Sequence, residues 1–304
     1  MSGASTTALM TALIRGVHSR RDDAPLFDDP YGERLISAAE RPMLLDRFLT
    51  MLGEADRTHL RALADPDEAL DCAVQANPAY GGVVVRSRWT EERLAEAIEQ
   101  GVRQYIIVGA GFDSFVFRRP PAAASLRVIE IDSAPTQALK RERAAAAGLS
   151  FGDHVELIAA DLESEGVGPA LATVPHAAER PSFVSCLGVL PYLTVAGVQR
   201  LLGSIAAGIA TGSELVFDYL EPEAVAGDAS DPALQRVRLE LATTGAERWV
   251  SGLRPEALAD QLATLGMTLL DDLGGEQLHQ RYGARRNLTI PRRLHLSRAR
   301  VGKT

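Results

Sequence analysis

The chain has 304 residues, of which 46% are hydrophobic and 24% charged, and these are the proportions of an ordinary soluble globule with a sizeable core. Its formal net charge of −8 argues against a nucleic-acid partner, because phosphate binding needs a clustered basic face. Two cysteines are too few for a disulfide framework or a zinc cluster, and no signal peptide or membrane span is visible, so we expect a cytoplasmic protein without metal or membrane contact.

The residues before about Tyr80 are predicted to form a helical cap. Leucine and phenylalanine recur at helical spacing over 44–52, prolines interrupt the pattern, and no strand repeat is evident. We therefore predict that residues 1–85 form a lid with a substrate pocket. A helix over 90–100 is expected to lead into a second domain, residues 86–304.

Residues 105–114 read YIIVGAGFDS and predict a nucleotide-binding turn. The first four residues are too few for a helix and rich in β-branched side chains, so a buried parallel strand fits best. Gly109 and Gly111 allow a tight turn and a close approach of the backbone to a ligand. Asp113 or Ser114 is expected to cap the helix that follows.

Two further strand ends carry acids. The run 126–132 ends in Glu130 and Asp132, where a ribose diol needs an acceptor, and the run 155–160 ends in Asp161 and Leu162, suited to an adenine amino group and ring. Any one acid is more simply a helix cap or a turn residue, but three such strand ends together indicate a ligand site. We prefer Asp132 to Glu130 for the ribose, and we expect the two side chains to point to opposite faces of the strand.

The glycine-rich turn also bears on which adenosine cofactor is bound. A dinucleotide fingerprint, G-x-G-x-x-G, has a third glycine where this chain has Ser114, and the Asp113 carboxylate would face a pyrophosphate unfavourably. S-adenosylmethionine carries a sulfonium and an ammonium group and no phosphate. The residues therefore favour S-adenosylmethionine over NAD or NADP.

Strands and helices alternate beyond the turn, which predicts an α/β fold with a doubly wound, mainly parallel sheet. We expect strands over 182–186 and 215–219, helices over 195–209 and 255–265, and a loop over 222–232. Late strands are expected over 267–270 and 287–290. The arginine-rich end, residues 285–300, is interpreted as a solvated strand edge or tail.

Six motifs in order resemble one family, the leucine carboxyl methyltransferase-like class I S-adenosylmethionine-dependent methyltransferases, over about residues 12–290. They are LFDDPY at 26–31, RSR at 86–88, VGAGFDS at 108–114, IEID at 129–132 with Lys140 after it, DL at 161–162 and GVLPYL at 188–193. The resemblance implies a Rossmann-like class I methyltransferase fold whose last strand pair is antiparallel.

The resemblance also implies site roles. Arg86 is expected to grip the methionine carboxylate with both arms of its guanidinium, and Tyr192 to lie near the transferred methyl group. Arg15 and Arg20 are candidates to meet an acidic substrate or the cofactor carboxylate, although a solvated helix face explains them equally well. The chain departs from the family at Leu187, where a glutamate is usual, and at Phe115, where an arginine is frequent.

The leading function is O-methylation of a carboxylate or hydroxyl on a small molecule. A carboxylate acceptor needs no general base, whereas a phenol or enol does, and His18, His59 and Tyr192 are candidates among which the sequence does not choose. The alternatives are a non-methylating protein that uses S-adenosylmethionine structurally or electrostatically and, less favoured, an NAD(P)-dependent oxidoreductase. The acceptor's identity and the oligomeric state are not predicted.

Overall fold

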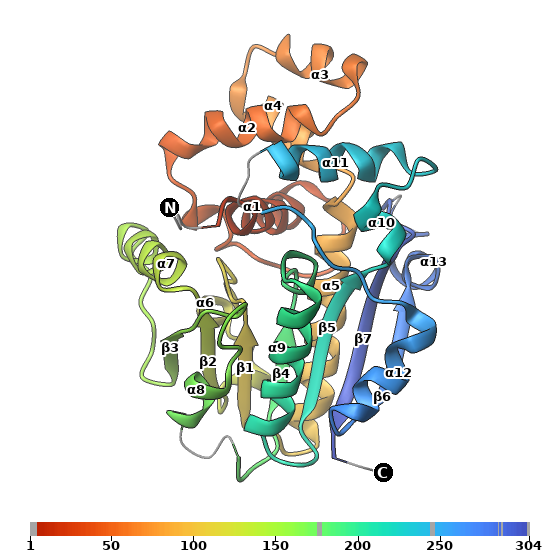
Figure 1. Ribbon diagram of the computed structural model, residues 1–304. Helices are drawn as coiled ribbons and strands as arrows, with labels where there is room; N and C mark the ends of the chain where they lie inside the picture. Colours follow the sequence, from red (N-terminus) through yellow and green to blue (C-terminus); the bar gives the residue numbers. More distant parts are fainter. Residues whose placement is uncertain (1–4, 175–177, 244–246, 285, 287, 303–304) are drawn as a thin grey trace.

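The computed structural model describes residues 5–174, 178–243, 247–284, 286 and 288–302. A seven-stranded sheet with the order β3-β2-β1-β4-β5-β7-β6 lies between helices and beneath a helical cap (Figure 1). The strands are β1 Gln104–Val108, β2 Arg127–Asp132, β3 Val155–Ala159, β4 Phe183–Cys186, β5 Glu214–Leu220, β6 Met267–Gly274 and β7 Leu294–Val301. The pairs from β3 to β5 are parallel and β7 is antiparallel to both neighbours, which confirms the predicted doubly wound, mainly parallel sheet.

The helices of the sheet layers and the cap are numbered along the chain. The α-helices are α1 Thr6–Arg21, α2 Arg41–Thr50, α3 Glu54–Arg61, α4 Pro66–Gln75, α5 Tyr80–Glu99, α6 Phe115–Arg118, α7 Ala134–Ala146, α8 Gly168–Ala172, α9 Val195–Gly208, α10 Pro222–Ala226, α11 Pro232–Thr243, α12 Pro255–Thr264 and α13 Gly275–Leu278. Short turns of other helix types are η1 Glu33–Leu35, η2 Ala38–Glu40, η3 Pro121–Ala123, η4 Leu190–Tyr192 and η5 His279–Gly283. Of the helices described, none has both the length and the apolarity that a membrane crossing requires.

Alternate residues of the central strands pack into two separate cores. Ile106 and Val108 of β1 lie in a cluster with α8, α9 and α12, whereas Tyr105 and Ile107 lie in one with α5 and the cap (Figure 1). Side chains that alternate between the two faces of a strand explain this division. Because both faces are covered, β1 is fully buried, and its carboxyl end is directed toward the cap (Figure 1).

Helix α5 is longer than the sequence predicts, since it begins at Tyr80 and not near residue 90. Two glycines and three valines at its start have low helix propensity, and tertiary packing overrides that propensity. A Cβ on Gly81 would lie 2.2 Å from the carbonyl oxygen of Thr289, so this turn of the helix packs directly on backbone. The helix runs without interruption from the cap down to the start of β1.

The region after β5 differs from the predicted loop. It begins with α10 and continues into α11, which lies beside α2 in the cap (Figure 1). Arg236 of α11 donates to the carbonyl of Met51 at 3.1 Å, and Glu240 lies 3.4 Å from Arg47. The cap is therefore built from two parts of the chain, the N-terminal helices and α11.

The prediction for the last strand is wrong. Residues 288–290 are not a strand, residue 287 lies outside the described residues, and the last strand is β7. The part of the arginine-rich end that lies in β7, residues 294–300, is neither an edge nor a tail, because β7 lies between β5 and β6. Residue 285 of that end lies outside the described residues. Arg298 pairs with Asp271 at 2.7 Å and Arg300 with Glu214 at 2.7 Å, so charged partners on both neighbouring strands accommodate a sequence that looks solvated.

Candidate functional site

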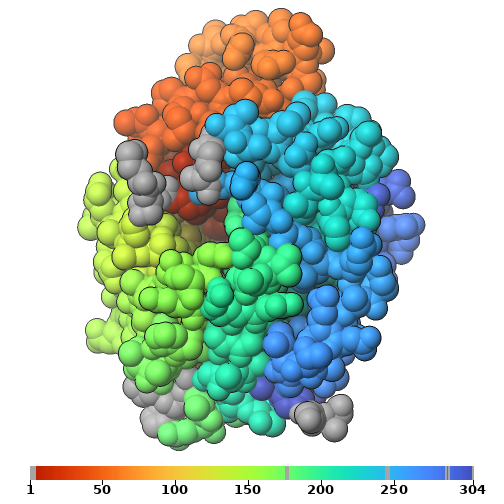
Figure 2. All heavy atoms as spheres, viewed as in Figure 1, coloured from red at the N-terminus to blue at the C-terminus, as the bar shows by residue number. Residues whose placement is uncertain are grey.

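A cavity of about 360 Å³ lies where the carboxyl ends of β1, β2, β4 and β5 meet the cap. The molecular surface is hollowed at this level, and the dark red atoms of α1 are visible inside the hollow (Figure 2). The strand ends contribute the glycine-rich turn and the residues around Gly188, while α1, α5, α11 and the segment after α11 form the opposite wall. A ligand across the carboxyl ends of parallel strands is the arrangement expected of such a sheet.

The glycine-rich turn forms one wall of the cavity. Gly109 and Gly111 have φ angles of +67° and +49°, in the left-handed region that favours glycine. A Cβ on Gly109 would also lie 2.2 Å from the Val189 side chain, so the turn and the segment after β4 pack closely. Asp113 lines the cavity, and its Oδ1 accepts a hydrogen bond from the Phe115 N–H at 2.7 Å at the start of α6.

Asp132 and Glu130 of β2 have different surroundings. Asp132 lines the cavity, and its carboxylate accepts hydrogen bonds from the N–H groups of Gly111 and Ser133, both at 2.6 Å. Burial raises the pKa of Asp132, and the two N–H groups oppose that rise. Glu130 does not line the cavity; it is 1% exposed and pairs with Lys140 at 2.5 Å.

The expectation that Glu130 and Asp132 point to opposite faces is wrong, because residues two apart on a strand share a face. The two acids are separated by depth, since Asp132 is the last residue of β2 and Glu130 lies further inside the sheet. Only Asp132 is in reach of a ligand in the cavity.

The pair after β3 is also divided. Leu162 lines the cavity, whereas Asp161 is exposed and absent from its lining. One oxygen of Asp161 accepts hydrogen bonds from the N–H groups of Glu163 at 3.0 Å and Ser164 at 3.2 Å. The structure thus gives Asp161 the turn-capping role, and Leu162 is the member of the pair at the ligand cavity.

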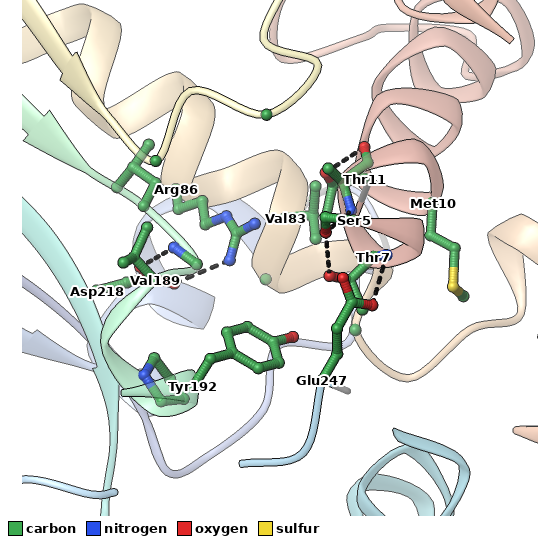
Figure 3. Close-up of a pocket in the computed structure, with 18 of the residues that line it drawn as sticks. Ser5, Thr7, Met10, Thr11, Val83, Arg86, Val189, Tyr192, Asp218 and Glu247 are labelled. Atoms are coloured by element: carbon green, nitrogen blue, oxygen red, sulfur yellow. Dashed lines mark hydrogen bonds and ion pairs between the residues drawn. The ribbon is translucent and has the colours of Figure 1, made fainter. Parts of the chain in front are cut away.

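Arg86 reaches the cavity from α5 and is held by a residue that the sequence analysis missed. Its Nη1 lies 2.9 Å from Oδ2 of Asp218 on β5, and the other oxygen of Asp218 accepts from the Gly188 N–H at 2.5 Å (Figure 3). A Cβ on Gly188 would lie 2.7 Å from Nη2 of Arg86. The sequence does carry a signal for this role, because Asp218 is an acid inside the otherwise apolar run 215–220 and a buried charge requires a partner.

Arg15 joins the cap to the glycine-rich turn. Its Nε lies 2.9 Å from Oδ2 of Asp29, and its Nη2 donates to the carbonyl of Phe112 at 2.7 Å. Burial works against ionisation of Asp29, but the charges of Arg15 and Arg118 outweigh it and hold the Asp29 pKa below its usual value. Arg15 lines the cavity with its charge already paired, whereas Arg20 bonds Glu33 and Asp71 outside it.

Tyr192 is the last residue of η4 and lies on the wall of the cavity that faces α1. Its side chain points across the cavity toward Glu247 and the first turn of α1 (Figure 3). Burial raises the pKa of the Tyr192 phenol, hydrogen bonding to Trp249 lowers it, and the charge of Glu247 raises it. Glu247 accepts a hydrogen bond from the Thr7 N–H at 3.0 Å, where the start of a helix favours a carboxylate. No motif pointed to Glu247 or Trp249, because their places depend on how α11 folds over the cavity.

No histidine is among the described residues that line the cavity. His18 is fully buried in the cap, its Nδ1 lies 2.7 Å from Asp22, and its Nε2 accepts from the Leu26 N–H at 2.8 Å, so its role is structural. His59 is exposed on α3. Within the described ranges, no three His, Cys, Asp or Glu side chains gather in a geometry that suits a metal ion.

The chain matches known proteins along most of its length. Residues 8–206 match the family model described as leucine carboxyl methyltransferase. A Bacillus subtilis protein named "Putative S-adenosyl-L-methionine-dependent methyltransferase YktD" is 26% identical over 300 residues, which cover 96% of each chain. A protein of Saccharopolyspora erythraea with the same name, lacking the suffix, is 32% identical over 220 residues, 72% of this chain and 69% of the relative.

Solved structures share the fold at low sequence identity. A DUF574 family protein from Streptomyces avermitilis superimposes with a TM-score of 0.59 at 15% identity, over 98% of each chain. A protein from Thermobifida fusca described as a "putative methyltransferase" gives a TM-score of 0.53 at 18% identity, over 88% of this chain and 100% of the other.

Proposed function

Because the chain belongs to the leucine carboxyl methyltransferase family, we propose that it transfers the methyl group of S-adenosylmethionine to an oxygen atom of a small molecule. The observation that carries the proposal is the cavity at the strand ends, with the glycine-rich turn on one side and Arg86 on the other. Its volume of about 360 Å³ lies within the range of about 300–1,000 Å³ that is usual for small-molecule pockets.

The residues present fit this cofactor. Among the described residues, four carboxylates line the cavity, namely Asp113, Asp132, Asp218 and Glu247, against the two guanidinium groups of Arg15 and Arg86. This excess of negative charge suits a ligand with a sulfonium and an ammonium group. Asp132 would accept from the ribose hydroxyls, Leu162 would pack on the adenine, and Arg86 would hold the methionine carboxylate. The bound sulfonium supplies a methyl group that is already electrophilic.

The protein's own contribution is alignment and the exclusion of water. Turns at Gly109 and Gly111 would let the backbone approach the cofactor, and α1 and α11 line the cavity opposite the strand ends, where an acceptor would bind. Positioning a nucleophile behind the bond that breaks accounts for much of the rate in such reactions. Tyr192, on the wall opposite α1, would orient the acceptor.

Thermal unfolding with S-adenosylhomocysteine tests the proposal. At about 100 times its Kd, one bound ligand per chain should add about 2.7 kcal/mol to the free energy of unfolding. The same scan with NAD and NADP serves as the control. Stabilisation by NADP but by neither sulfur cofactor would contradict methyl transfer and favour an oxidoreductase.

A further inference from the structure

The acceptor side of the cavity is lined largely by apolar side chains. They come from α1, the end of α2, α5 and α11, and include Met10, Met51, Val83, Leu234, Val237 and Leu241. These residues are far apart in the sequence and share only their position around the space that faces the strand ends. Such a wall binds an apolar molecular skeleton and offers nothing to a solvated ion.

The charges around this wall are unfavourable for an anion. The cations among the described lining residues are Arg15 and Arg86. Arg15 is paired with Asp29 at 2.9 Å, and Arg86 is paired through Nη1 with Asp218 at 2.9 Å and is assigned by the proposed function to the methionine carboxylate, so neither is left for an acceptor. On the acceptor side, Glu247 sits at the start of α1 with its carboxylate bonded to the Thr7 N–H. An acceptor carboxylate would lose its hydration and meet a second negative charge.

We infer that the acceptor is an uncharged, largely apolar molecule with a hydroxyl group, and that Glu247 receives the hydroxyl proton and excludes carboxylate acceptors. The inference rests on the proposed function. In the reaction, the acceptor oxygen bonds to the methyl carbon while the carbon–sulfur bond breaks and its electron pair stays on sulfur. The hydroxyl proton passes to the Glu247 carboxylate, so charge and atoms balance.

The chemistry of the product tests the acceptor class. The purified chain is incubated with a metabolite extract and S-adenosylmethionine labelled in its methyl group, and the products are treated with mild base. We expect the label to remain in base-stable methyl ethers. Label released as methanol from methyl esters would overturn the inference and leave the proposed methylation of oxygen intact. Label on nitrogen or carbon would overturn both the inference and the proposed methylation of oxygen. No labelled product in any fraction would remove the proposed function and the inference with it.

Variants separate the role of Glu247 from a general loss of activity. Glu247→Gln keeps an oxygen for the Thr7 N–H and removes the charge, so ether formation should fall while esters rise about tenfold relative to ethers, as expected for a nearby charge in a partly buried site. Glu256→Gln, whose side chain is 70% exposed on α12, is the matched control and should change neither product. An unchanged ratio in Glu247→Gln would overturn the role of Glu247.

Fluorescence quenching reads the charge of the cavity without any reaction. The chain has two tryptophans; Trp89 is fully buried, and Trp249 lines the cavity. We expect iodide to quench Trp249 less than caesium does, each relative to free tryptophan amide, with Trp249→Phe giving the background. Glu247→Gln should raise iodide quenching about twofold by removing the repulsion. Iodide quenching at least as strong as caesium quenching would contradict an anion-excluding wall.

Discussion

Asp218 fixes the direction of Arg86 by holding one arm of its guanidinium. The same carboxylate bonds the backbone of Gly188, so α5, β5 and the turn after β4 meet at one charged group. Asp218 is 2% exposed, and the folded state is destabilised when a buried carboxylate of this kind loses its partner. We assign Asp218 as the positioning residue for Arg86.

Asp218→Asn should weaken binding of S-adenosylhomocysteine about tenfold or more, because a charge-assisted bond worth about 1.5–3 kcal/mol no longer orients Arg86. Adenosine, which has no carboxylate for Arg86, should bind with unchanged affinity. Calorimetry with both ligands measures the difference, and Arg88→Lys is the control because Arg88 pairs with Glu92 and is 43% exposed. Equal losses for the two ligands would mean that Asp218 supports the fold alone.

Single residues could be placed at the cavity from the sequence where the local backbone geometry is restricted. Gly109, Gly111 and Asp113 lie at the cavity because a strand followed by a glycine-rich turn has few possible conformations. Glu130 and Asp161 do not line it, because an acid near a strand end can equally pair within the sheet or cap its own turn. The ligand roles of the residues that do line the cavity stay predictions.

At the scale of elements, a buried ion pair attaches α7 to β2. Glu130 and Lys140 are each 1% exposed, and one oxygen of Glu130 has no partner within the described chain. Burial raises the pKa of Glu130 to about 7, with Lys140 opposing the rise. The contribution of Glu130 protonation to the free energy of unfolding is therefore fully present below pH 4.5, the pKa of Glu130 in the unfolded chain. It is lost as the pH rises through about 7, the pKa of Glu130 in the fold.

Lys140→Met should lower the free energy of unfolding by about 3–5 kcal/mol at pH 8, because it leaves a buried carboxylate unpaired. The loss should be smaller at pH 5, where Glu130 takes up a proton. Denaturant unfolding at both pH values measures this, and the double variant Glu130→Gln with Lys140→Met should recover much of the stability and lose the pH dependence. An equal loss at both pH values would show that packing of Lys140, and not its charge, holds α7.

Elements with strong local signals were predicted well, and those fixed by distant contacts were not. The runs that form β1, β2 and β4 are apolar and bounded by turns, so each was expected within a residue or two of its observed bounds. Helix α11 and the first turns of α5 lack such signals and owe their form to packing against α2 and against residues 289–291. The sequence does not predict β7 in its observed place, because its arginines suggest exposure to solvent, whereas in the fold they form ion pairs with acids on the neighbouring strands.

At the scale of the molecule, the cap and the sheet are joined through Asp29. Its Oδ2 bonds Arg15, which holds the glycine-rich turn, and its Oδ1 accepts from the N–H groups of Tyr31 at 3.2 Å and Gly32 at 3.0 Å. Because the pKa of Asp29 is lowered in the fold, the ionised Asp29 carboxylate stabilises the fold at neutral pH. This contribution is lost as the pH falls through the lowered pKa.

Asp29→Asn should destabilise the whole chain by about 3–5 kcal/mol at pH 7 and weaken S-adenosylhomocysteine binding as well, because Arg15 is left buried without its counter-charge. Chemical denaturation and calorimetry measure the two effects. Asp28→Asn changes the exposed neighbour and should leave both nearly unchanged. Destabilisation without any loss of affinity would mean that the Arg15 contact to Phe112 does not shape the cofactor turn.

The continuity of α5 bears on how chimeras of this protein and its relatives should be built. Residues 85 and 86 are consecutive within that helix, and Arg86 is carried on it, so a joint at this position would cut a helix that spans cap and sheet. A graft of the N-terminal helices alone would also leave out α11, which follows β5 in the sequence. An exchange of acceptor preference between relatives therefore requires two segments to move together, residues up to about 79 and residues of about 221–253.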